Sequence, residues 1–230
     1  MTSTADTDPD AGALRRHRRP EPVFLRAVAS ALGGARSVLE LRTGPVSYVP
    51  ADRSVVADEP AALRADVRAD ATLLTFPTTP VLDRLRPSGG PVVVLARDPE
   101  RVRAGWLAEY APEVVAAEAD SLPTLDELAA ALGAAVETVR LPVPFTCVDG
   151  FSEAYYARPE RLLDADVRAA DPAWSGVDDL SARRSVAALR TALASGAWDE
   201  RHGALRRRPT FDGSVVLLRT TGPDGATRPA

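Results

Sequence analysis

Residues 91–96, Pro-Val-Val-Val-Leu-Ala, are apolar at nearly every position, and this run limits the possible folds more than any other. A strand of this composition is buried on both faces, as in a parallel sheet covered by helices. Shorter apolar or alternating runs predict further strands at residues 37–41, 53–57, 71–76, 136–143 and 211–220. Because predicted helices lie between them, we expect an α/β fold, a Rossmann-like, mostly parallel sheet with helices on both faces.

Several helices carry their own start and stop signals. Pro20 and Pro22 precede apolar residues at helical spacing, and the pair Gly33-Gly34 ends that segment. The run Thr124-Leu125-Asp126-Glu127 fits a capping box, with Gly133 as the stop. A long helix is expected over residues 178–195, and shorter helical pieces over 61–67 and 81–85.

The 230 residues suffice for one well-buried core and are few for two. Residues 1–13 are small, polar and acidic, and we expect them to be a disordered tail. The remainder, residues 14–230, is expected to form a single domain in which residues 149–174 make a small cap. The basic segment that follows the tail, residues 14–19, reads as a solvated stretch.

Composition excludes several functional classes. The net charge is −4 and all 28 basic residues are arginines, so no global basic field indicates nucleic acid as a partner. The single cysteine, Cys147, rules out an internal disulfide, and only His17 and His202 could supply imidazole to a metal. No apolar run has the length of a membrane span, and the first residues lack the apolar core of a secretory signal. We therefore expect a cytoplasmic protein without a membrane partner and without a metal.

A possible ligand loop follows the first predicted strand. Glu40-Leu41-Arg42-Thr43-Gly44 ends that strand in a turn, and Glu59 ends the second strand. In dinucleotide folds, a glycine turn lets the backbone approach the ligand, and an acid after the second strand accepts hydrogen bonds from ribose hydroxyls. Taken alone, the pattern occurs in many α/β proteins.

A resemblance that extends over more of the chain suggests a function for this loop. Residues 36–60 resemble the cofactor motif of small actinobacterial-type class I S-adenosylmethionine-dependent methyltransferases, in which a Gly-Ala-Gly-Thr-Gly-Ser-Tyr loop precedes Pro, Asp-Arg, an apolar strand and Glu-Pro. Further segments are similar in the same order, at residues 106–110, 141–144, 147–151, 154–160 and 195–199. The resemblance implies a methyltransferase fold with an antiparallel last strand. It also implies cofactor contacts from Gly44, Ser47, Tyr48 and Glu59.

The loop departs from that family in its glycines. Arg42 replaces the first glycine and Val46 the last, so that only Gly44 remains. A side chain at the first position would fill space that the backbone leaves to the cofactor, and Pro45 removes a backbone donor.

Two more features of the family are missing. Between Glu59 and Val92 the chain is shorter by about one strand, so we expect the sheet to lack one edge strand. The family's histidines are replaced within Phe76-Pro77-Thr78-Thr79 and Pro144-Phe145-Thr146-Cys147. These losses together predict that no cofactor is bound, with S-adenosylmethionine as the alternative.

The predicted substrate pocket is aromatic, because aromatic side chains commonly line small-molecule sites. Its expected wall consists of Phe76, Trp106, Tyr110, Phe145, Cys147, Tyr155 and Tyr156. The candidate catalytic groups are the hydroxyls of Thr78, Thr79 and Tyr155.

The neighbouring residues have simpler interpretations. Asp149 reads as a helix cap, and Cys147 more often packs as a small apolar residue than acts as a nucleophile. Arg158 is expected to pair with a nearby acid on a helix surface, and His202 to lie at the surface.

Three functions fit these observations. The first is a methyltransferase-like protein of bacterial specialised metabolism that promotes a cofactor-independent cyclisation or isomerisation of an organic small molecule. The second is an active methyltransferase with a remodelled loop. The third is a non-catalytic partner of another biosynthetic enzyme, and a homodimer is the other expected assembly.

Overall fold

The computed structural model describes residues 14, 16–57, 68–83, 85, 90–133 and 135–221. They divide into two compact units. The sheet unit contains Pro22–Val102, Ala119–Pro142 and the described residues from 214 onward. The helical unit contains Arg103–Glu118, Val143–Gly213 and the described residues up to 21.

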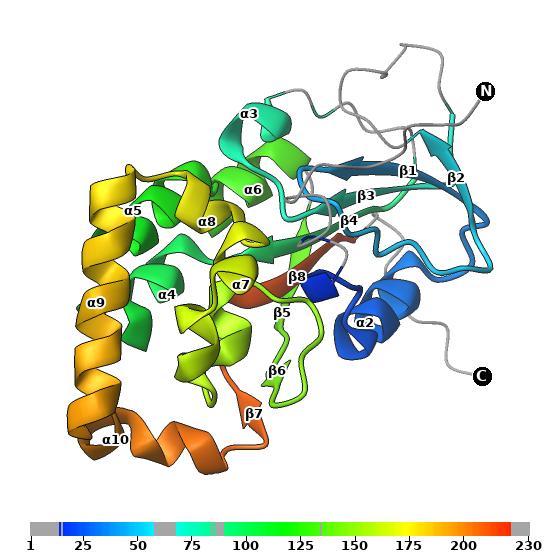
Figure 1. Ribbon diagram of the computed structural model, residues 1–230. Coiled ribbons are helices and arrows are strands. Elements are labelled where there is room, and N and C mark those ends of the chain that lie inside the picture. Colours follow the sequence, from blue (N-terminus) through cyan, green and yellow to red (C-terminus); the bar gives the residue numbers. More distant parts are fainter. Residues whose placement is uncertain are drawn as a thin grey trace, which may run out of the picture. The chain divides into compact units, whose positions relative to one another are not determined.

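The sheet unit is built on one six-stranded sheet with the order β2-β1-β3-β4-β8-β5 (Figure 1). Its strands are β1 (Ser37–Arg42), β2 (Ser54–Ala57), β3 (Ala71–Thr75), β4 (Val92–Arg97), β5 (Val136–Arg140) and β8 (Val215–Thr220). The pairs among β1, β2, β3 and β4 are parallel, and β8 runs antiparallel to both β4 and β5. The predicted α/β class and the antiparallel last strand are confirmed. Among the described residues β2 forms one edge of the sheet.

Strand β4 is buried at every position, as its composition predicts. Val92, Val94 and Ala96 join a core cluster with apolar residues of α3 (Thr79–Leu82) and α6 (Leu125–Leu132). Side chains alternate along a strand, so the equally buried Val93 and Leu95 face the opposite side of the sheet. Helix α2 (Pro22–Leu32) packs against β4 and β8 with buried Phe24 and Val28 among its core residues.

The caps read from the sequence are present. The Thr124 side chain accepts from the backbone N–H of Glu127, and the Glu127 carboxylate accepts from the Thr124 backbone, which completes a capping box. Asp178 caps α9 (Asp179–Ser195), and Gly196 ends it in the left-handed region at φ 80°. These helix ends are set by residues within four positions of one another, which is why sequence alone identifies them.

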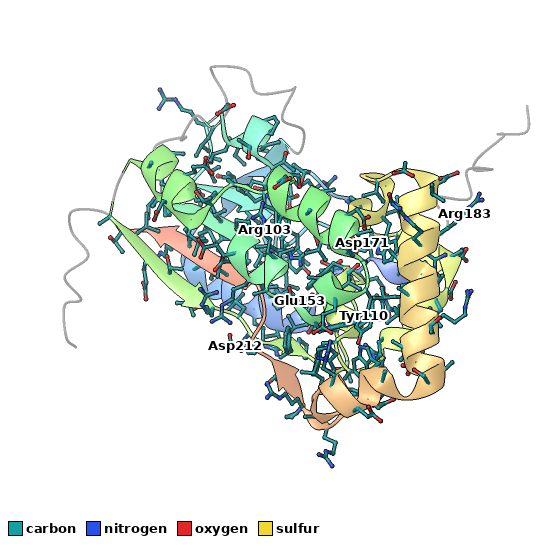
Figure 2. All side chains as sticks on the ribbon, turned by 90° about the vertical axis from the view of Figure 1, so that its left-hand side faces the viewer. Arg103, Tyr110, Glu153, Asp171, Arg183 and Asp212 are labelled. Carbon is teal, nitrogen blue, oxygen red and sulfur yellow. The ribbon has the colours of Figure 1, made fainter. Side chains whose placement is uncertain are left out.

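The helical unit consists of short helices and turns arranged along the long helix α9 (Figure 1). Its α-helices are α5 (Pro112–Ser121, which continues into the sheet unit), α7 (Ala165–Ala169), α8 (Pro172–Ser175), α9 and α10 (Ala197–His202). Its 3₁₀ helices are η2 (Trp106–Glu109), η3 (Ser152–Tyr155), η4 (Pro159–Leu163) and η5 (Gly203–Arg207), and α4 (Pro99–Arg103) leads into it. Strands β6 (Val143–Pro144) and β7 (Thr210–Phe211) pair antiparallel. Arg183 on α9 points away from the unit (Figure 2).

Two predicted strands are each divided in two. Residues 136–143 form β5 and, after Leu141 and Pro142, the short β6 that pairs within the other unit. Residues 211–220 likewise divide into the end of β7 and the start of β8. Proline has no backbone N–H to donate to a ladder, which accounts for the break at Pro142. The predicted helix over 61–67 lies outside the described residues, and the helix expected over 81–85 spans Thr79–Leu82.

Two expectations at the start of the helical unit were wrong. Arg18, read as part of a solvated stretch, is almost fully buried and its Nε donates to a carboxylate oxygen of Asp149. Asp149, read as a helix cap, is itself completely buried by this contact, while the N-cap of η3 is Phe151. A buried carboxylate needs a charged or hydrogen-bonding partner, and here that partner lies 131 residues away in the sequence.

The close approach of two chain segments at Gly90 gives a test of the sheet unit. A Cβ atom at this position would lie 1.9 Å from the backbone oxygen of Asp70. At Gly44, by contrast, no atom lies within 4 Å of the corresponding point. We expect Gly90→Ala to lower the free energy of unfolding by about 1–3 kcal/mol, because the backbone must move. Gly44→Ala is the matched control, and urea denaturation with equal midpoints for both variants would contradict the packing.

Candidate functional site

The sheet order places a topological switch point between β1 and β3. β1 lies between β2 and β3, so the connections leaving β1 and β3 run toward opposite edges of the sheet. Arg42 at the end of β1 is in register with Thr75 at the end of β3. In open α/β sheets, ligands bind outside the carboxyl ends of the strands at such a point. The loop after β1 is therefore the candidate ligand site of the sheet unit.

This loop folds back on the carboxylate of Glu40. The Glu40 side chain is completely buried. It accepts a hydrogen bond from Ser47 Oγ at 2.8 Å and one from the backbone N–H of Tyr48 at 3.2 Å. Arg42 Nη1 lies 3.4 Å from the same carboxylate. The acid that opens the predicted cofactor motif is thus held by two groups of the loop and by Arg42 at the end of β1.

A second set of contacts ties the loop to β3. Thr43 Oγ1 donates to the backbone oxygen of Phe76 at 2.5 Å. Phe76 itself has φ 46°, a left-handed conformation that is unusual for a residue with a bulky side chain. Beside it, the hydroxyl of Thr75 is buried and has no hydrogen-bond partner in the described part of the chain. Strained backbone and unsatisfied polar atoms are typical of functional sites.

The predicted cofactor residues differ in their surroundings. Gly44 is partly exposed and has open space around it, and Ser47 is engaged by Glu40. Tyr48 is completely buried, with its ring 6.3 Å from that of Phe24 and 6.0 Å from that of Phe76. Glu59 lies outside the described residues.

The candidate catalytic hydroxyls of the sheet unit lie just beyond this loop contact. Thr78 is half-buried, and Thr79 is exposed as the first residue of α3. The buried hydroxyl of Thr75 is a third one that sequence reasoning missed. A hydroxyl residue at the end of a fully buried strand is the signal that would have pointed to it.

The predicted substrate-wall residues of the helical unit form two groups. In the first, Phe145 and Tyr155 lie on the guanidinium of Arg158, whose central carbon is 5.3 Å and 5.9 Å from the two ring centroids. Tyr156 stacks on Phe211, with 5.1 Å between the centroids, and its hydroxyl donates to the backbone oxygen of Arg208. We call residues 145, 147, 155, 156 and 158 the Arg158 cluster.

The thiol and the two phenols of the Arg158 cluster are kept in their neutral forms by burial. Burial raises the pKa of the Cys147 thiol, and its sulfur contacts the backbone oxygen of Asp149 at 3.5 Å. Burial also raises the pKa of Tyr155 and that of Tyr156. All three groups are therefore neutral at physiological pH, and they can supply shape and hydrogen bonds rather than a nucleophile or a base.

The second group surrounds His202. Its imidazole lies 6.3, 6.2 and 5.7 Å, ring centre to ring centre, from Trp106, Tyr110 and Trp198. Glu109 Oε1 is 3.3 Å from His202 Nε2. The expectation that His202 lies at the surface was wrong, because its side chain is only 15% exposed. An imidazole beside a carboxylate in an aromatic setting is a group that sequence reasoning missed, since Glu109 and His202 are far apart in the chain.

Arg158 also differs from its expected role. Its predicted helix-surface partner Glu160 instead pairs with Arg206 at 3.1 Å. Among the described residues, no group of histidine, cysteine and acidic side chains is arranged to hold a metal ion. No described helix combines the length and the apolar character needed to cross a bilayer.

The Glu40 contacts generate a stability prediction. We expect Glu40→Leu to lower the free energy of unfolding by about 2–4 kcal/mol, because it removes the buried carboxylate that accepts from both the Ser47 hydroxyl and the Tyr48 N–H. Arg42→Leu is the matched control and should cost less, because Arg42 is 26% exposed and can be replaced by water. Equal losses in urea denaturation would show that the loop does not depend on the carboxylate.

The environment of Glu109 predicts a pH dependence. The hydrogen bond from Arg201, at 2.7 Å, lowers the pKa of the Glu109 carboxyl. The contact therefore stabilises the fold above the ordinary pKa of glutamate, and this contribution disappears as the pH falls through the lowered value. We expect Glu109→Gln to lower the melting temperature at pH 7, and the difference from the wild type to shrink as the pH falls through the lowered pKa of Glu109. Glu113→Gln is the control on the more exposed pair with Arg184. A difference that stays constant throughout an acid titration would refute this assignment.

Comparisons with known proteins bear on the fold. No protein-family model matches the chain, and no curated protein matches it. Among solved structures, the chain is similar to a protein from Anabaena variabilis ATCC 29413 described as a methyltransferase from an antibiotic biosynthesis pathway. The TM-score is 0.73 and the identity 17%, over 90% of this chain and 100% of that chain.

Two further structures align at lower scores. YjhP from E. coli gives a TM-score of 0.43 at 14% identity, over 97% of this chain and 99% of that one. The plantazolicin methyltransferase BpumL in complex with SAH gives 0.39 at 9% identity, over 93% and 85%. The likeness to the Anabaena structure agrees with the strand order and with the antiparallel β8. The chain has the fold of the class I S-adenosylmethionine-dependent methyltransferases.

Proposed function

We propose that this protein acts on an organic small molecule in bacterial specialised metabolism and promotes a step without methyl transfer, such as a cyclisation or an isomerisation. The description of the Anabaena protein as part of an antibiotic biosynthesis pathway supports the substrate class. Resemblance to small actinobacterial-type methyltransferases supports the bacterial setting. A shared fold alone does not fix the reaction, so the proposal rests on the site.

The observation that carries the proposal is the engagement of Glu40. Its buried carboxylate already accepts from Ser47 and Tyr48 and contacts Arg42, so it offers little to a ligand. Pro45 has no N–H to donate, and Arg42 takes the position of the motif's first glycine. As they stand, these loop residues do not fit S-adenosylmethionine, and we derive no step through it.

Without a cofactor, the side chains of these sites can contribute by holding the substrate in position. Thr75, Thr78 and Thr79 present hydroxyls near the carboxyl end of β3, and these can hold a polar group of a substrate. The Arg158 cluster offers neutral aromatic surfaces in the helical unit. Holding the substrate in its reactive conformer lowers the barrier without proton transfer by the protein.

Two observations favour the alternative of an active methyltransferase. The space around Gly44 is open, and the unsatisfied hydroxyl of Thr75 lies at the switch point where this fold binds its ligands. If Arg42 moved away from Glu40, a cofactor could approach the loop. A direct binding measurement separates the two functions.

The test is calorimetric titration of the full-length protein with S-adenosylmethionine and with S-adenosylhomocysteine. We expect no binding tighter than about 1 mM, which corresponds to roughly −4 kcal/mol. We expect the double variant Arg42→Gly, Val46→Gly to remain as weak, because restoring two glycines leaves Pro45 and the engaged Glu40 in place. Micromolar binding by the wild-type protein would replace our proposal with the methyltransferase alternative.

A further inference from the structure

The guanidinium of Arg158 has a pair of donors without acceptors. Its Nε and Nη2 atoms are both buried, and neither has a hydrogen-bond partner in the part of the chain that the structure describes. The rings of Phe145 and Tyr155 lie against it, at 5.3 Å and 5.9 Å. Leaving a buried donor unpaired is costly, and more so when the donor is charged. A protein keeps such a group when something else satisfies it.

The two nitrogens without acceptors, Nε and Nη2, lie on the same edge of the guanidinium. Nε–H and the adjacent N–H of Nη2 point in parallel, and this is the side-on edge that binds both oxygens of a carboxylate at once. Had the free atoms been on different edges, two separate waters would satisfy them equally well. A matched pair of parallel donors instead favours a planar group with two oxygens.

Three carboxylates of neighbouring segments are already engaged. Asp149 is held by Arg18, and Glu160 pairs with Arg206. Asp171 accepts from the backbone N–H of Ser152 at 2.7 Å and also from its hydroxyl. This buried acid (labelled in Figure 2) thereby fixes the start of η3, the segment that carries Tyr155. These three acids therefore stabilise the segments around Arg158. None of the ion pairs described above includes Arg158 itself.

We infer that Arg158 binds the carboxylate of an organic acid whose flat, apolar body packs against Phe145 and Tyr155. Access is through Phe145, which lies in a turn and is 37% exposed, so its ring can move aside while the buried Tyr155 stays in contact. The inference rests on the proposed function only in taking this acid to be the substrate. It narrows that substrate from an organic small molecule to an aromatic or conjugated carboxylate.

Benzoate is a suitable probe, and benzamide is its uncharged counterpart of the same shape. We expect benzoate to bind the full-length protein in the millimolar range, which suits a ligand of its size, and benzamide to bind at least about tenfold more weakly. Inorganic phosphate is the third ligand, because it shares the negative charge and lacks the apolar body. Binding of benzamide as tight as that of benzoate, or of phosphate tighter than benzoate, would overturn the inference.

Two experiments test whether benzoate binds at Arg158: binding to substituted variants, and NMR of the wild-type protein. Arg158→Lys keeps the charge but removes the side-on pair of donors, and it should weaken benzoate binding by about tenfold or more. Arg161→Lys, an exposed residue of η4, the short helix that Arg158 precedes, is the matched control and should bind as the wild type does. Unchanged binding by Arg158→Lys would refute the site.

If Arg158→Lys fails to fold, NMR of the wild-type protein decides. Saturating benzoate should give contacts between its ring protons and those of Phe145 and Tyr155, and contacts elsewhere only would refute the inference. This result is independent of cofactor binding. Tight S-adenosylmethionine binding would remove the proposed function and leave the carboxylate site intact, whereas failure of benzoate to bind would remove the site alone.

Discussion

The buried carboxylate of Glu40 is the interaction on which the strand-end site depends. A charge with no exposure to water has to be compensated by donors, and the nearest ones belong to the six residues that follow β1 and to Arg42 within it. Satisfying Glu40 therefore determines the path of the loop. In a binding motif of this kind the loop is normally shaped by glycines and by the ligand. Here the protein supplies the donors itself, which is why a loop with one remaining glycine is still ordered.

The contact between Thr43 and Phe76 extends this constraint to β3. Because the side chain of Thr43 is bonded to a backbone oxygen of Phe76, the end of β3 is held in a conformation that Phe would not adopt freely. The left-handed backbone of Phe76 is thus next to the Thr75 hydroxyl, which has no partner among the described residues, and both border the switch point. A ligand that binds at the switch point would therefore contact strand ends that are tied together by the hydrogen bond between Thr43 and Phe76.

The sequence predicted those features that depend on neighbours in the chain. The all-apolar run of β4, the capping box at Thr124 and the ends of α9 are each determined by residues within a few positions, and all three are present. The parallel sheet and its antiparallel last strand followed from the order of elements and from resemblance.

Predictions from the sequence were wrong for side chains whose contact partner lies far away in the chain. Arg18 finds Asp149, and His202 finds Glu109, across long stretches of chain, and no local pattern announces either contact. Arg158 was misread for a related reason, because an acid two residues away was available but pairs with Arg206. Among the predicted site residues, those of the helical unit separate into two aromatic groups that composition alone does not distinguish. Their part in a site remains a prediction.

The position of β8 has a consequence for how the chain reaches its folded state. This strand lies between β4 and β5, yet it follows β5 by more than 70 residues and comes from the last described segment. The gap between β4 and β5 therefore stays open until residues 215–220 have been synthesised and can pair with both strands. Pairing over such separations is slow, and unpaired strand edges promote aggregation. Until β8 is in place, the backbone edges of β4 and β5 that it covers in the folded sheet are free to pair wrongly.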